Sequence, residues 1–172
     1  MTRIVDNPAR WGVNFDAFVG NPYTSAQDDL VGPLRDNPEI ADVTGANIGS
    51  VTINGSDTAT IGFDSAKGDL SPMVLRGRDP LKPNEIGIGA EVARRLDVDV
   101  GDTVEVVGSS GEPSLFTVVG IVVTPDSAGN GAAITFDAYE RVNPGATENI
   151  ALVKFGRGVS ACLLYTSDAA DE

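Results

Sequence analysis

The chain has 172 residues, with 12 lysines and arginines against 25 aspartates and glutamates, so its formal charge is −13 at pH 7. This balance argues against nucleic acid as a partner, and the absence of histidine excludes Ser-His-Asp catalysis and histidine-ligated zinc within these residues. At 41% hydrophobic residues the chain can bury a real core, which excludes a disordered acidic tail.

The beginning of the chain predicts a strand followed by a helix. Residues 15–20 form a short apolar run that ends at a turn, which indicates a strand. Thr24 and Ser25 offer N-cap oxygens to a predicted helix over residues 26–36, whose apolar side chains fall on one face. No apolar run approaches the roughly 20 residues that a membrane-spanning helix requires.

A hairpin is the strongest local prediction in the first third of the chain. After a predicted strand at residues 41–48, Asn54-Gly55 lies between strands expected at 51–53 and 58–63. This dipeptide is typical of a type I′ turn, because both positions need a positive φ.

From Lys67 the sequence becomes rich in turn residues, so we place one lobe boundary there and a second near Thr135. We expect no single sheet to use strands from both sides of these boundaries. A half-exposed strand and a buried strand should form a hairpin in this part of the chain. The elements expected after Lys67 are strands at 85–88, 103–107, 115–123, 132–135 and 149–155, and helices at 90–96 and 137–142.

The end of the chain carries two expectations. The last predicted strand lacks the crossover to a partner that such strands normally have, so it is expected to be unpaired. Residues 162–172 (CLLYTSDAADE), which include the only cysteine, resemble the translation of a transposase adaptor used in sequencing libraries. We expect them to form no part of the fold, and their deletion to change the melting temperature by less than about 1 °C.

Two arginines and one tryptophan are candidates for structural or partner contacts. We favour an ion pair within the domain for Arg76 and Arg78 over a bound anion or partner. Specifically, we predict that Arg78 bonds a carboxylate or backbone carbonyls within its own lobe, with Glu85 and Asp102 as the favoured partners. Trp11 is either an exposed aromatic contact or part of a small core.

Three further motifs have a structural interpretation that we favour over a functional one. Gly87-Ile88-Gly89 lies between a strand and a helix but lacks the third glycine of a dinucleotide fingerprint. Asp97, Asp99 and Asp102 lack the glutamate of a calcium-binding loop. Asp64-Ser65-Ala66 resembles an aspartyl-protease triplet without its flanking residues. We therefore predict no catalytic residue, cofactor or metal.

Read together, five segments resemble the MacB-like periplasmic core domain of FtsX-like ABC transporter permeases. They are residues 7–16 (NPARWGVNFD), 74–80 (VLRGRDP), 84–89 (NEIGIG), 100–104 (VGDTV) and 116–120 (FTVVG). Each segment alone is weak, but their order and spacing make the set moderately specific.

The resemblance implies an α+β fold of two lobes, a porter-like α/β lobe with an inserted β-rich lobe, C-terminally incomplete. Residues 1–66 would begin the porter-like lobe, 67–135 would be the insert, 136–161 would start the truncated returning half, and 162–172 would be the tail. The resemblance further implies a non-catalytic domain at the extracytoplasmic face of the cell membrane. Its implied partners are an ABC ATPase subunit or domain, a second permease copy, and an extracytoplasmic substrate or protein of unknown identity.

Two other classes remain open from the sequence. One is a stand-alone β-rich binding module, which needs a complete fold before the tail. The other is a carboxylate-dependent hydrolase, which needs two aspartates together in a cleft.

Overall fold

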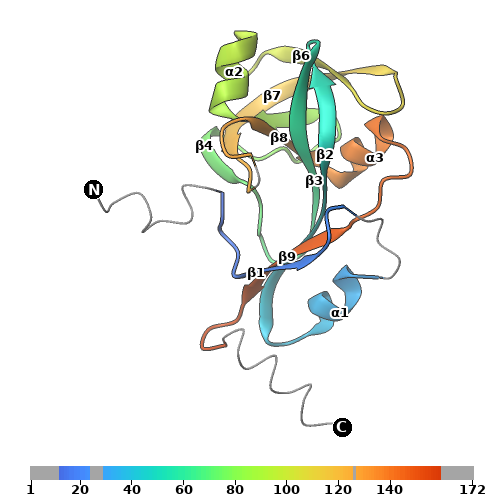
Figure 1. Ribbon diagram of the computed structural model, residues 1–172. Helices are drawn as coiled ribbons and strands as arrows, with labels where there is room; N and C mark the ends of the chain where they lie inside the picture. The colour runs from blue at the N-terminus through green and yellow to red at the C-terminus, as the bar shows by residue number, and fades with distance from the viewer. Residues whose placement is uncertain (1–11, 24–28, 126, 160–172) are drawn as a thin grey trace.

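The computed structural model describes residues 12–23, 29–125 and 127–159, and these form one mixed sheet with three short helices (Figure 1). The sheet order is β1-β9-β2-β3-β8-β5-β7-β4, and β6 pairs with β2 and β7. The α+β class predicted from the sequence is therefore confirmed. The strands are β1 (Ala17–Gly20), β2 (Ile40–Ile53), β3 (Ser56–Lys67), β4 (Met73–Gly77), β5 (Glu85–Ile88), β6 (Thr103–Val107), β7 (Pro113–Val123), β8 (Gly131–Thr135) and β9 (Ile150–Phe155), and the helices are α1 (Val31–Asp36), α2 (Ala90–Leu96) and α3 (Phe136–Val142).

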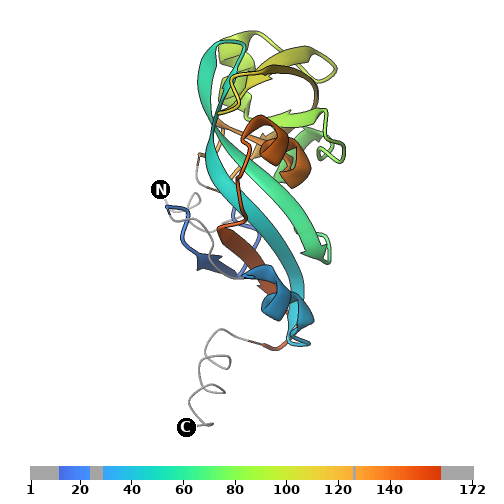
Figure 2. The same cartoon turned by 90° about the vertical axis from the view of Figure 1, so that its right-hand side faces the viewer.

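The β2–β3 hairpin runs along the length of the molecule (Figures 1 and 2). The separate strands expected at 41–48 and 51–53 are one strand of 14 residues, with a register shift between Val43 and Thr44. Asn54 and Gly55 have φ angles of 46° and 80°, as a type I′ turn requires. The hairpin prediction is thus confirmed, and its strands are longer than the sequence suggested.

The sheet crosses both predicted lobe boundaries. β3 pairs in parallel with β8 from Ala59↔Gly131 to Phe63↔Thr135, and the tip of β2 pairs with β6. The expectation that no sheet would use strands from both segments is therefore wrong. The turn residues after Lys67 mark a connection at the end of β3, and β8 returns beside the same strand.

The clusters of buried apolar side chains are arranged along the β2–β3 hairpin, and they do not respect the predicted lobe boundaries. One cluster joins β5, β6, β7 and β8 with Val51 and Ile53 from the tip of β2. It also includes Tyr139 and Val142 of α3, although residues after 135 were expected to belong to the returning lobe. A separate cluster packs α1 against β2 and β9, with Val43 and Val153 at its centre.

The last strand is paired on both sides, contrary to the expectation of an unpaired end. β9 is antiparallel to β1 through four residue pairs, from Ala17↔Val153 to Gly20↔Ile150, and it is antiparallel to β2 along its other edge. The backbone bonds of this strand are therefore met by segments far earlier in the chain. Local sequence could not show this, because the partners lie more than 100 positions away.

Several element boundaries differ from prediction for local reasons. α1 begins at Val31 rather than at residue 26, and the Asp29 side chain accepts a 2.7 Å hydrogen bond from the Gly32 amide at its start. The predicted caps Thr24 and Ser25 lie outside the described residues, as do Trp11 and residues 162–172. β4 was missed, because its residues lie within the turn-rich segment.

Among the described helices, none is long and apolar enough to cross a membrane.

Candidate functional site: an ion pair and the groove beside it

Arg78 and Glu85 form a two-point ion pair at the start of β5. The Arg78 nitrogens Nη1 and Nη2 lie 2.7 Å from Glu85 Oε2 and Oε1, respectively. The Glu85 side chain is 7% exposed, whereas that of Arg78 is 50% exposed. This geometry confirms the predicted Arg78–Glu85 bond, and it is the strong bidentate form of arginine–carboxylate pairing.

The ion pair keeps Glu85 charged. Hydrogen bonding from Arg78 lowers the pKa of Glu85 from 4.5 to about 2 against the opposing effect of burial, and the Leu81 amide adds a 3.0 Å hydrogen bond to Oε2. Glu85 therefore binds the loop of residues 78–85 at two points, the Arg78 guanidinium and the Leu81 amide. The sequence signal for this anchor was the short spacing between the two charges.

A second arginine holds the other end of the same loop. Arg141 of α3 donates a 2.5 Å hydrogen bond from Nη2 to the Pro83 carbonyl. Its guanidinium carbon also lies 5.4 Å from the centre of the Phe116 ring, which is a cation–π distance. The loop is thus fixed to both β5 and α3, a role of Arg141 that the sequence analysis missed.

Arg76 lies in β4, and Asp102 lies in the turn between α2 and β6. Arg76 pairs with Asp99 at the surface, so the predicted intradomain ion pair for Arg76 is present. Asp102 Oδ2 accepts a 2.7 Å hydrogen bond from the Asp99 amide. Of the two acceptors predicted for Arg78, the structure therefore selects Glu85. The roles of Arg76, Arg78, Glu85, Asp102 and Trp11 as partner contacts stay predictions.

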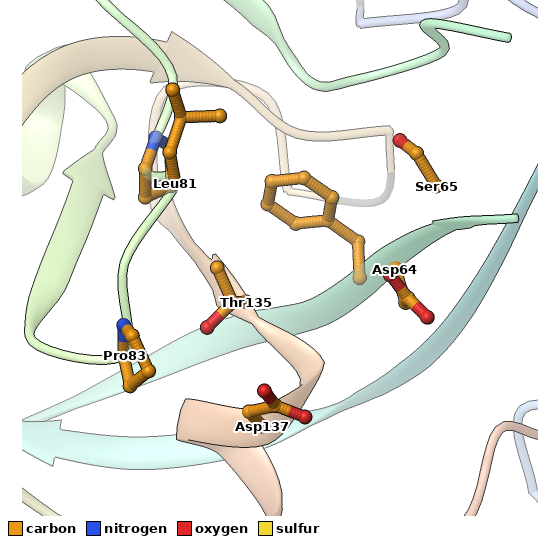
Figure 3. A pocket seen from close by; sticks show the side chains of 8 residues that line it. Asp64, Ser65, Leu81, Pro83, Thr135 and Asp137 are labelled. Carbon is orange, nitrogen blue, oxygen red and sulfur yellow. The ribbon is translucent and has the colours of Figure 1, made fainter.

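A groove of about 340 Å³ lies beside this anchored loop (Figure 3). In the close-up, Leu81 and Pro83 stand on one side, Asp64 and Ser65 on the other, and Thr135 and Asp137 between them. Phe63 and Pro80 complete the lining. The groove combines an apolar wall with two carboxylates, and such a surface can bind an apolar group that carries a positive charge.

These groove residues had little signal in the sequence. In the sequence, Asp64 belongs to a triplet for which we favour a structural role over a protease motif. Asp137 is only the first residue of a predicted helix. The structure brings them together because β8 pairs beside β3, which places Thr135 opposite Phe63. A groove made by three separate segments, at residues 63–65, 80–83 and 135–137, cannot be read from local spacing.

Comparison with known proteins places this fold. The family model described as "MacB-like periplasmic core domain" matches residues 3–164, which is most of the chain. The chain therefore belongs to the MacB-like periplasmic core domain family, as its sequence motifs implied. Domains of this family are extracytoplasmic parts of ABC transporter permeases.

Solved structures agree with this assignment at the level of the fold. The periplasmic region of MacB from Actinobacillus actinomycetemcomitans is 15% identical, with a TM-score of 0.60 over 95% of this chain and 84% of that chain. The extracellular domain of the ABC-type transporter YknZ from Gram-positive bacteria is 15% identical, with a TM-score of 0.62 over 88% of each chain. A permease domain from Porphyromonas gingivalis is 17% identical, with a TM-score of 0.50 over 83% of this chain and 70% of that chain. No curated protein sequence gives a significant match.

Proposed function

We propose that this chain is a non-catalytic extracytoplasmic domain of an FtsX-like, MacB-type permease, and that it passes the ATP hydrolysis cycle of an ABC ATPase to a substrate or protein outside the membrane. The family match over residues 3–164 carries this proposal. The single continuous sheet supports it, because a domain that relays movement must move as a body. The implied partners are the ATPase subunit or domain, a second permease copy and the extracytoplasmic ligand.

The location of the domain can be tested by cysteine labelling of the complete permease in intact cells. Any native cysteine of the complete permease is first replaced by serine, so that single thiols can be introduced. Ser110 is exposed in the β6–β7 loop, whereas Val106 is 0% exposed. A membrane-impermeant maleimide should label Ser110→Cys in intact cells and should leave the matched Val106→Cys unlabelled. Labelling of Ser110→Cys only after cell lysis would contradict an extracytoplasmic location.

Coupling can be tested with the same exposed position. We expect spin labels at Ser110→Cys in two permease copies, assembled with the ATPase in nanodiscs, to change their separation between the nucleotide-free and ATP–vanadate states. The physical reason is that nucleotide-driven movement reaches a rigid domain as a displacement of the whole body. An unchanged distance distribution, in a complex that still hydrolyses ATP, would refute the coupling.

A further inference from the structure

We infer that the groove between Leu81 and Asp64 docks a segment of an extracytoplasmic partner protein in which a lysine or arginine is flanked by apolar side chains. This inference rests on the proposed function, because it names the chemistry of the partner that such a domain would meet. Its evidence is the shape of the groove, its charge and the rigidity of its wall.

The shape of the groove suits a peptide. Leu81 is 73% exposed, although it is a large apolar residue, and it stands between Pro80 and Pro83. Phe63, which is 7% exposed, belongs to the same lining. A pocket for a small molecule would enclose its ligand, whereas an exposed apolar wall beside a buried aromatic ring receives side chains from one side.

The charge of the groove selects a cation. Asp64 and Asp137 are exposed, and no hydrogen bond or ion pair found in the described part of the chain involves either side chain. None of the eight lining residues is basic. Burial and then the negative charge of Asp64 raise the pKa of Glu148, which shows that a second carboxyl group lies near Asp64. A lysine or arginine would therefore meet carboxylates with no intramolecular partner to displace.

The apolar wall is already held in place. Glu85 accepts hydrogen bonds from the Leu81 amide and from Arg78, and Arg141 bonds the Pro83 carbonyl. A ligand that contacts this wall need not order it first, which reduces the entropic cost of docking. Pre-organisation of this kind is a feature of binding surfaces. The Arg78–Glu85 pair would therefore serve binding as well as stability.

The test uses the full chain of 172 residues and fluorescein-labelled peptides, with anisotropy as the readout. One peptide alternates leucine with lysine, and a matched peptide alternates leucine with glutamate. We expect saturable binding of the lysine peptide alone. Asp64→Asn with Asp137→Asn should weaken it about fivefold or more, because each exposed ion pair is worth up to about 1 kcal/mol. Leu81→Ala should weaken it by a similar factor through lost apolar contact.

Matched controls come from exposed residues of the same type outside the groove. Asp57→Asn with Asp97→Asn should keep the affinity, and so should Leu115→Ala, since Leu115 is 68% exposed. All the substituted groove side chains are exposed, so thermal melting should show every variant folded.

Three results would overturn the inference. They are equal binding of the two peptides, equal affinities of groove and control variants, and dimerisation of the chain that only the groove variants abolish, which would make a second copy the occupant. The spin-label experiment uses no peptide. If the domain moves with nucleotide but binds neither peptide, the docking inference is refuted and the proposed coupling stands.

Discussion

At the residue scale, Glu85 is the charged group on which the most local structure depends. Its side chain is 7% exposed and receives hydrogen bonds from Arg78 and from the Leu81 amide. Replacement by alanine removes all of these acceptors at once. We expect Glu85→Ala to lower the free energy of unfolding by about 2 kcal/mol, measured by urea denaturation. The matched control Glu112→Ala, in an exposed loop, should change it by less than about 0.5 kcal/mol. Equal effects of the two variants would show that the ion pair does not stabilise the fold.

The same residue makes a prediction about pH. Because the pKa of Glu85 falls from 4.5 to about 2 on folding, its stabilisation is complete above pH 4.5 and is lost as the pH falls towards 2. The difference in unfolding free energy between the wild type and Glu85→Gln should therefore be constant from pH 7 to about 5 and shrink below it. A difference that grows on acidification would contradict this assignment.

At the scale of elements, the packing of α3 on the hairpin depends on a glycine. A Cβ added at Gly62 in β3 would overlap the Cβ and ring of Tyr139. Tyr139 is 4% exposed and belongs to the main apolar cluster, so α3 would have to move away from the sheet. We expect Gly62→Ala to cost about 2 kcal/mol in chemical denaturation.

The control for this substitution is another glycine. A Cβ at Gly129 would make only ordinary contacts, the nearest at 3.4 Å from Glu91. Gly129→Ala should therefore be within about 0.5 kcal/mol of the wild type. If Gly62→Ala is equally mild, the contact between α3 and β3 is looser than the structure shows.

At the scale of the whole molecule, one sheet joins segments that the sequence assigned to different lobes. β2 contributes to all three apolar clusters, so melting any one cluster disturbs the hairpin. We therefore predict a single unfolding transition, with equal calorimetric and van't Hoff enthalpies. Two resolved transitions in differential scanning calorimetry would restore the idea of independent lobes.

Local sequence patterns predict several of the elements and, through their motifs, the family. Asn54-Gly55 specified its turn, the helix at 90–96 was located to the residue, and the alternating strand β6 and buried strand β7 paired as expected. These features follow from periodicity and turn chemistry, which act over a few residues. The close spacing of Arg78 and Glu85 likewise made their ion pair predictable.

Tertiary structure alone decided which distant strands became neighbours. The pairing of β3 with β8 and of β9 with β1 and β2 satisfies backbone groups across long separations in sequence, and no local pattern encodes those partners. These pairings join strands of the expected lobes in one sheet and bring Asp64 and Asp137 to one groove. The groove exists because burial of apolar surface selects one global arrangement of strands, whereas composition and spacing constrain only each strand separately.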